Sequence, residues 1–131
     1  MIRFLFWILF GFWYNLLVKK NQYRRRDSMN TDNLAHQFTE ELKDKMLRAK
    51  RECRYNPTRF NQMIARHGGV ETAKHLISSG LRTGHPSDGY TTLLLCGRLD
   101  LTMEHSVCKS EYKELFTECE ISYCKSLLGS E

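Results

Sequence analysis

The sequence predicts an all-α protein, and three observations lead to this prediction. Apolar residues recur every three to four positions along most of the chain, as on one face of an α-helix. Residues that favour helix starts and stops separate these stretches. No long stretch alternates polar and apolar residues as a half-buried strand does. We therefore expect a compact bundle of about five to seven short helices in residues 29–131, preceded by an N-terminal hydrophobic helix.

The first helices of the bundle are predicted from residues 34–80. An apolar stripe indicates a helix of about 20 residues, and its members are Leu34, Phe38, Leu42, Met46, Ala49 and Cys53. Asn56 and Pro57 are typical of the N-cap and first position of a second helix. Gly68 and Gly69 favour a left-handed end to that helix, and a third helix is expected to end near Gly80.

The main loop is predicted over residues 80–89. Ser87 or Asp88 is expected to cap a helix that carries Leu93, and Gly97 is expected to end it. This predicts a short helix between two polar, loop-forming blocks.

The C-terminal part is predicted as a series of short helices. Asp100 or Thr102 is expected to cap residues 103–107, and Ser110 precedes another apolar set. Thr117 and Glu120 form a T-x-x-E capping box for the last helix. Leu99 and Leu101 are expected to reach the core.

Residues 1–28 differ from the rest of the chain in composition. Residues 4–18 are apolar apart from Asn15, and as a helix they would be about 22 Å long, short of a hydrocarbon core of about 30 Å. Two interpretations stay open. The segment is a single-span inner-membrane anchor with a cytoplasmic C-terminal domain, or translation starts at Met29 and the protein is cytoplasmic.

The positive charge is concentrated in the same segment. The chain carries a net charge of +5, and residues 1–28 alone account for it, which leaves residues 29–131 neutral overall. A neutral domain argues against nucleic-acid binding as the main function. The alternative is a basic face in residues 43–66 that contacts phosphates, with candidate residues Lys43, Lys50, Arg51, Arg54 and Arg59.

The five cysteines form an odd set without a C-x-x-C pair, which favours free thiols in a reducing compartment. Their spacing matches no common zinc motif, so we predict neither a metal nor another cofactor. His85 lies near Ser87 and Asp88, but the loop's turn and capping roles explain these residues without catalysis. We therefore predict no catalytic residue and no enzyme activity.

Four blocks resemble a small bacterial or phage helical domain without an assigned activity, which also occurs at the end of longer nuclease or defence-type proteins. The blocks are YNPTRF, GGVETAKHLI, PSDGYTTL and GRLDLTMEHSV with the following EYKELF. The resemblance covers most of residues 43–128, and it implies a fold unit rather than a reaction. Short members begin near the position of Met29. This chain departs from the pattern in a longer loop over residues 79–85 and in Cys108, where leucine is usual.

These observations predict a non-enzymatic interaction domain with a macromolecular partner, more readily a protein than a nucleic acid. Exposed polar residues of the loop blocks are the expected contact sites. The partner-binding candidates are Ser87, Asp88, Arg98, Asp100 and Glu104.

Overall fold

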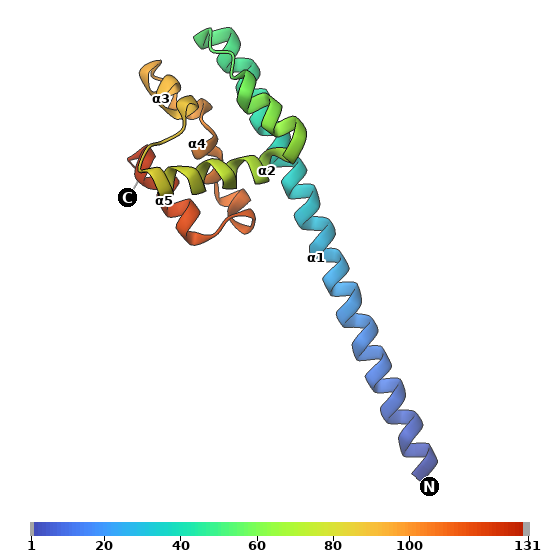
Figure 1. The fold of residues 1–131 in the computed structure, drawn as a ribbon. Helices are drawn as coiled ribbons and strands as arrows, with labels where there is room; N and C mark the ends of the chain where they lie inside the picture. Colours follow the sequence, from blue (N-terminus) through green and yellow to red (C-terminus); the bar gives the residue numbers. More distant parts are fainter. Residues whose placement is uncertain (1, 130–131) are drawn as a thin grey trace. The chain divides into compact units, whose positions relative to one another are not determined.

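The all-α prediction is confirmed in the computed structural model, which describes residues 2–129, with side chains from residue 8 onward. The described residues contain five α-helices and two 3-10 helices, and no strand (Figure 1). In order, they are α1 (Ile2–Cys53), α2 (Thr58–Thr83), α3 (Asp88–Leu95), η1 (Leu99–Leu101), α4 (Met103–Val107), η2 (Ser110–Leu115) and α5 (Glu118–Leu128). This number agrees with the predicted five to seven helices.

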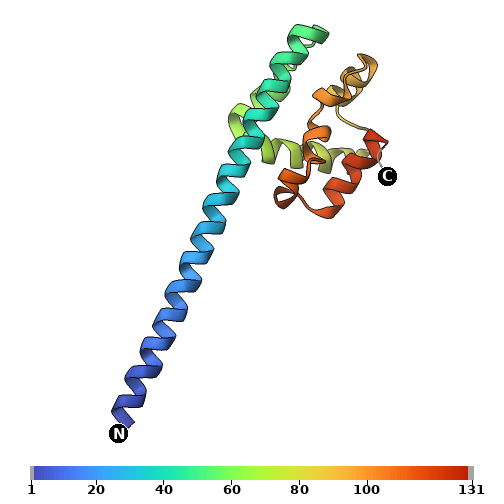
Figure 2. The same cartoon turned by 180° about the vertical axis from the view of Figure 1, so that it is seen from behind.

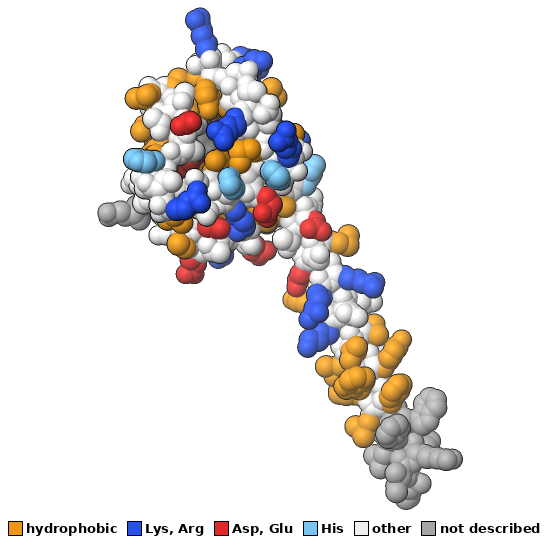
Figure 3. All heavy atoms as spheres, in the orientation of Figure 1, with side chains coloured by type: hydrophobic (Ala, Val, Ile, Leu, Met, Phe, Trp, Pro, Cys, Tyr) orange, Lys and Arg blue, Asp and Glu red, His pale blue; other side chains and the backbone are white. Residues whose placement is uncertain are grey.

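The chain divides into two units, Met1–Asn33 and Leu34–Glu131, and the division falls within α1 rather than at residue 28. The expected helix of about 20 residues is therefore the last part of a longer helix. In the first unit, large apolar side chains of residues 8–18 are exposed, and basic side chains follow them along α1 (Figure 3). Among the described residues, no helix combines the length and the apolarity needed to cross a membrane.

The core of the second unit is built around Phe38 of α1. Its ring meets Tyr112 and Phe116 edge to face, with ring centroids 5.1 Å apart in both pairs. Leu42 of α1 and Ile77 of α2 belong to the same buried cluster. Both ribbon views show α4 and α5 side by side (Figure 2). These two C-terminal helices complete the core.

Helix α2 contains the predicted break at the glycine pair. Gly68 has a φ of 79° and non-helical geometry, so the chain turns there before the helix continues. Gly69 packs against α1, where its N–H donates to Thr39 Oγ1 at 3.0 Å. A Cβ at this position would lie 2.9 Å from the Thr39 Cα, so the close approach requires glycine.

The predicted end near Gly80 is wrong, because α2 continues to Thr83 and ends at Gly84, which has a φ of 73°. Gly80 is buried inside the helix, and the space beside it is taken by the Tyr123 hydroxyl. The connection to α3 is therefore shorter than the predicted loop of residues 80–89. Glycine serves here as a packing site rather than a helix end.

The capping predictions are confirmed at three helix starts. Ser87 Oγ accepts from the Tyr90 N–H, and Thr102 Oγ1 accepts from the His105 N–H. Thr117 and Glu120 form the predicted reciprocal capping box. Thr102 rather than Asp100 is thus the cap of α4.

The expectation that both leucines of the GRLDL block reach the core is half right. Leu101 is fully buried, whereas Leu99 is half-buried.

Candidate functional site

The second unit contains a cavity of about 640 Å³ between the α1–α2 turn, α2, the loop before α3, and α4. This volume lies within the range of small-ligand pockets, about 300–1,000 Å³. Its walls combine apolar side chains such as Phe60, Met63 and Leu76 with a few acidic and hydroxyl groups. The cavity therefore offers both an apolar surface and defined polar contacts.

Local backbone features form one wall of the cavity. Arg54 adopts a left-handed conformation with a φ of 53°, which reverses the chain after α1. The Tyr55 N–H then donates to the Ala49 carbonyl at 3.2 Å, and the buried Pro57 precedes α2. This turn directs Tyr55 to the cavity lining.

Glu104 is the most buried acidic group of the cavity, with 3% of its surface exposed. It lies in the first turn of α4, and the Ser87 hydroxyl donates to its Oε1 at 3.3 Å. No ion pair joins it to a cation within residues 8–129. Burial raises the pKa of Glu104, because removal from water disfavours the charged carboxylate.

Other polar groups line the cavity around this carboxylate. Asp88 is exposed in the first turn of α3, and burial and the charge of Asp88 raise the pKa of Tyr55. His75 and His85 also line the cavity and are exposed. The site thus holds two carboxylates at different depths.

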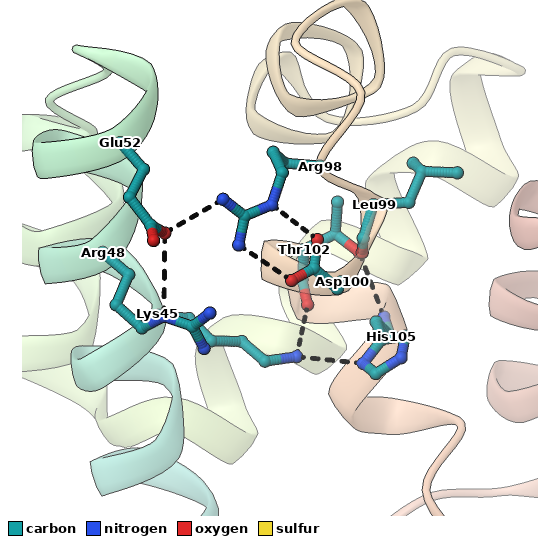
Figure 4. A network of polar contacts seen from close by, with 8 residues as sticks. All are labelled: Lys45, Arg48, Glu52, Arg98, Leu99, Asp100, Thr102 and His105. Atoms are coloured by element: carbon teal, nitrogen blue, oxygen red, sulfur yellow. Dashed lines mark hydrogen bonds and ion pairs between the residues drawn. The ribbon is translucent and has the colours of Figure 1, made fainter.

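Lys45 has a buried ammonium group, and its polar contacts are with residues other than Glu104 (Figure 4). Its Nζ donates to the Thr102 carbonyl at 3.2 Å and lies 3.2 Å from His105 Nδ1. Lys45 is 5% exposed, and burial lowers its pKa to about 8. Burial and the charge of Lys45 also lower the pKa of His105. These contacts fasten α4 to α1.

Arg98 forms a second polar cluster beside Lys45 (Figure 4). Its guanidinium group binds Asp100 through two hydrogen bonds of 3.0 Å and Glu52 through one of 3.0 Å. Arg48 approaches the same Glu52 carboxylate at 3.7 Å. This cluster joins the segment before α4 to the end of α1. Its charged groups pair with one another.

Glu41 is the centre of a third network. The Tyr112 hydroxyl donates to it at 2.6 Å, the Ser106 hydroxyl at 2.8 Å, and Lys109 Nζ pairs with it at 2.7 Å. Burial alone would raise the pKa of Glu41, but the hydrogen bonds from Lys109, Tyr112 and Ser106 outweigh it and hold the pKa at about 2. Sequence reasoning missed Glu41, since its partners are 65 and 71 residues away.

The structure divides the partner-binding candidates into two groups. Ser87, Asp88 and Glu104 come together at the cavity. Arg98 and Asp100 pair with each other in the separate cluster of Figure 4.

The candidates for nucleic-acid contact also divide. Lys43 pairs with Glu40 at 2.9 Å. The other four are exposed, and none forms an ion pair within the described residues; they are Lys50, Arg51, Arg54 and Arg59. Arg59 additionally lines the cavity.

All five cysteines are free thiols, and Cys124 is fully buried. The neighbouring Cys96 thiol raises the pKa of Cys53. Among the described residues, no group of three or more His, Cys, Asp or Glu side chains has an arrangement that could hold a metal ion.

Comparison of the chain with protein-family models, with curated proteins and with solved structures finds no match.

Proposed function

We propose that residues 34–129 form a non-enzymatic protein-interaction domain, whose cavity receives a lysine or arginine side chain from a partner protein. The observation that supports this proposal is the buried carboxylate of Glu104 in a cavity with apolar walls. Ser87 and Asp88, from the polar block before α3, complete the polar part of the same site.

The charge of Glu104 favours a cationic occupant. A buried charge without a counterion is costly, and an opposite charge with good geometry offsets that cost. Lys45 acts on Glu104 through its charge without forming an ion pair with it, since its ammonium group donates to the Thr102 carbonyl and lies beside His105. A cation brought by a partner would meet Glu104, with Asp88 as a second acidic group.

The apolar lining favours a long basic side chain over a compact cation. Lysine and arginine bury their methylene stems against apolar surface while their charged ends reach a polar partner. Phe60, Met63 and Leu76 provide such a surface beside Glu104.

The hydrogen bonds of Ser87 account for its place at the cavity. Its hydroxyl accepts from the Tyr90 N–H, which makes Ser87 the N-cap of α3. The same hydroxyl donates to Glu104, so it helps to hold the carboxylate in the cavity.

The test is selection from a displayed library of random peptides, followed by titration of a selected peptide. We expect enrichment of lysine or arginine flanked by apolar residues. Glu104→Gln should weaken binding by about 30-fold or more, because loss of one member of a buried charge pair costs about 2 kcal/mol or more. Replacement of the peptide's basic residue by norleucine should weaken binding similarly, and the two changes together should add little further loss.

Glu114→Gln is the matched control, since Glu114 is exposed and outside the cavity lining. The proposal is wrong if selected peptides lack basic residues, or if Glu104→Gln and Glu114→Gln bind them equally well.

Nucleic-acid binding is the second candidate function. It is favoured by the exposed side chains of Lys50, Arg51, Arg54 and Arg59, which are free to contact phosphates. Affinity for DNA or RNA should then fall steeply with salt, and charge reversal at Lys50 and Arg54 should abolish it. A binding constant that is insensitive to salt and to these substitutions contradicts this function.

A further inference from the structure

The described apolar side chains of the first unit form an exposed surface on α1. Its members are Ile8, Leu9, Phe10, Phe12, Trp13, Tyr14, Leu16, Leu17 and Val18. Phe12 is 68% exposed and Trp13 is 65% exposed. Soluble proteins rarely expose large contiguous apolar patches, and those that do use them for interaction. This surface needs an apolar occupant.

The distribution of these residues around the helix indicates what kind of occupant fits. They occupy positions 8–10, 12–14 and 16–18, so they cover about three-quarters of the helix circumference and leave only a narrow strip that contains Gly11 and Asn15. A partner helix in a coiled coil contacts one stripe with a 3.5-residue period. Lipid chains contact the helix from many sides, which suits a helix that is apolar over most of its circumference.

The charges that follow this surface favour an anionic bilayer. Five basic residues on the next turns of α1 are exposed: Lys19, Lys20, Arg24, Arg25 and Arg26. Figure 3 shows Lys and Arg side chains next to the apolar side chains of this helix. Basic residues beside an apolar segment are attracted to the anionic headgroups of a membrane surface. Packing a second copy of the helix alongside in parallel would instead bring like charges together.

The length of the apolar segment limits the depth of insertion. Residues 4–18 are apolar apart from Asn15, and along a helix they would rise about 22 Å at about 1.5 Å per residue, which is short of a hydrocarbon core of about 30 Å.

We propose that residues 8–26 bind an anionic lipid bilayer, with the apolar turns inserted into its hydrocarbon region and the basic residues at its headgroups. This proposal is independent of the cavity and its partner. It assigns the first unit a membrane-surface function without a spanning helix.

The test uses the full chain and vesicles of phosphatidylcholine with or without phosphatidylserine. Both tryptophans of the chain, Trp7 and Trp13, lie in the apolar segment, so tryptophan emission reports its environment alone. We expect a blue shift and co-sedimentation with phosphatidylserine vesicles, and weaker binding to phosphatidylcholine alone. Added salt should reduce the difference.

Two sets of variants separate charge and insertion. Arg24→Glu/Arg25→Glu/Arg26→Glu should weaken binding to phosphatidylserine vesicles by about tenfold or more. Arg82→Glu/Lys113→Glu/Lys125→Glu makes the same change of charge at exposed positions of the other unit and should leave binding unchanged. Phe12→Ser/Leu16→Ser should reduce the blue shift, whereas Leu81→Ser/Leu95→Ser, also at exposed leucines, should not.

Three outcomes would overturn the proposal. The first is no binding to phosphatidylserine vesicles while circular dichroism shows a folded helical protein. The second is equal loss of binding in both charge-reversal variants. The third is a blue shift that appears without vesicles and grows with protein concentration, which indicates a second copy of the chain as the occupant.

Discussion

Glu41 and Glu104 are both withdrawn from solvent in the second unit, but their surroundings differ. Glu41 receives hydrogen bonds from Tyr112 and Ser106 and pairs with Lys109, whereas Glu104 receives one from Ser87 and faces a cavity. Their pKa values move in opposite directions, down for Glu41 and up for Glu104. This comparison indicates that a buried carboxylate stabilises the fold when several hydrogen-bond donors surround it. A buried carboxylate with few donors can accept hydrogen bonds from a ligand.

The largest expected effect is on folding stability at Glu41. Glu41→Gln should lower the free energy of unfolding by about 2 to 3 kcal/mol, because it removes a partly buried ion pair with Lys109 and weakens the hydrogen bonds from Tyr112 and Ser106. Urea denaturation measures this change. The neighbouring Glu40→Gln is the control, since the Glu40–Lys43 pair is exposed, and it should leave the free energy of unfolding close to that of wild type. If the two variants lose equal free energy of unfolding, the Glu41 network stabilises the fold no more than the exposed Glu40–Lys43 pair, which contradicts the prediction.

The second effect is the acid sensitivity that Glu41 confers. Its pKa is about 2 in the folded protein against a usual 4.5, so the folded state favours the charged form. The resulting stability is fully present above pH 4.5 and is lost as pH falls toward 2. With allowance for partial exposure, it amounts to about 2 to 3 kcal/mol. The difference in unfolding free energy between wild type and Glu41→Gln, measured across this range, should shrink accordingly; a constant difference contradicts the assignment.

The smallest effect is expected at Glu104, and its sign is opposite. Because burial raises the Glu104 pKa, the folded state favours the protonated form, and wild-type stability declines as pH rises above 4.5. At neutral pH, Glu104→Gln should be as stable as wild type or more stable by about 1 kcal/mol. Chemical denaturation at pH 4 and pH 7 tests this. A destabilisation at pH 7 as large as that of Glu41→Gln would make Glu104 a structural residue.

Local sequence signals predicted much of the fold. The spacing from Leu34 to Cys53 marked the buried face of α1, and Ser87, Thr102 and Thr117 were recognisable as caps because capping depends on residues within three positions. The role of Gly80 has no local signal, since it depends on Tyr123, a residue 43 positions later in the chain. A glycine that ends a helix and one that admits a neighbouring ring look alike in sequence.

The site was less predictable than the fold. Ser87, Asp88 and Glu104 were selected as polar residues of two loop-forming blocks, and the structure places all three at one cavity. The burial of Glu104 follows from packing of α4 in the fold, which no local pattern reports. Arg98 and Asp100 belong to the same blocks, but they form an ion pair with each other.

The long sequence separation within the Glu41 network has a consequence for synthesis of the protein. Tyr112 follows Glu41 by 71 residues, and at about 5 to 20 residues per second it is made roughly 4 to 14 s later. During that interval, the last part of α1 is present on the ribosome without the hydroxyl groups and the aromatic rings that bury it. The second unit therefore completes its folding only when its C-terminal helices have emerged, and a chain truncated before η2 lacks the contacts needed to fold.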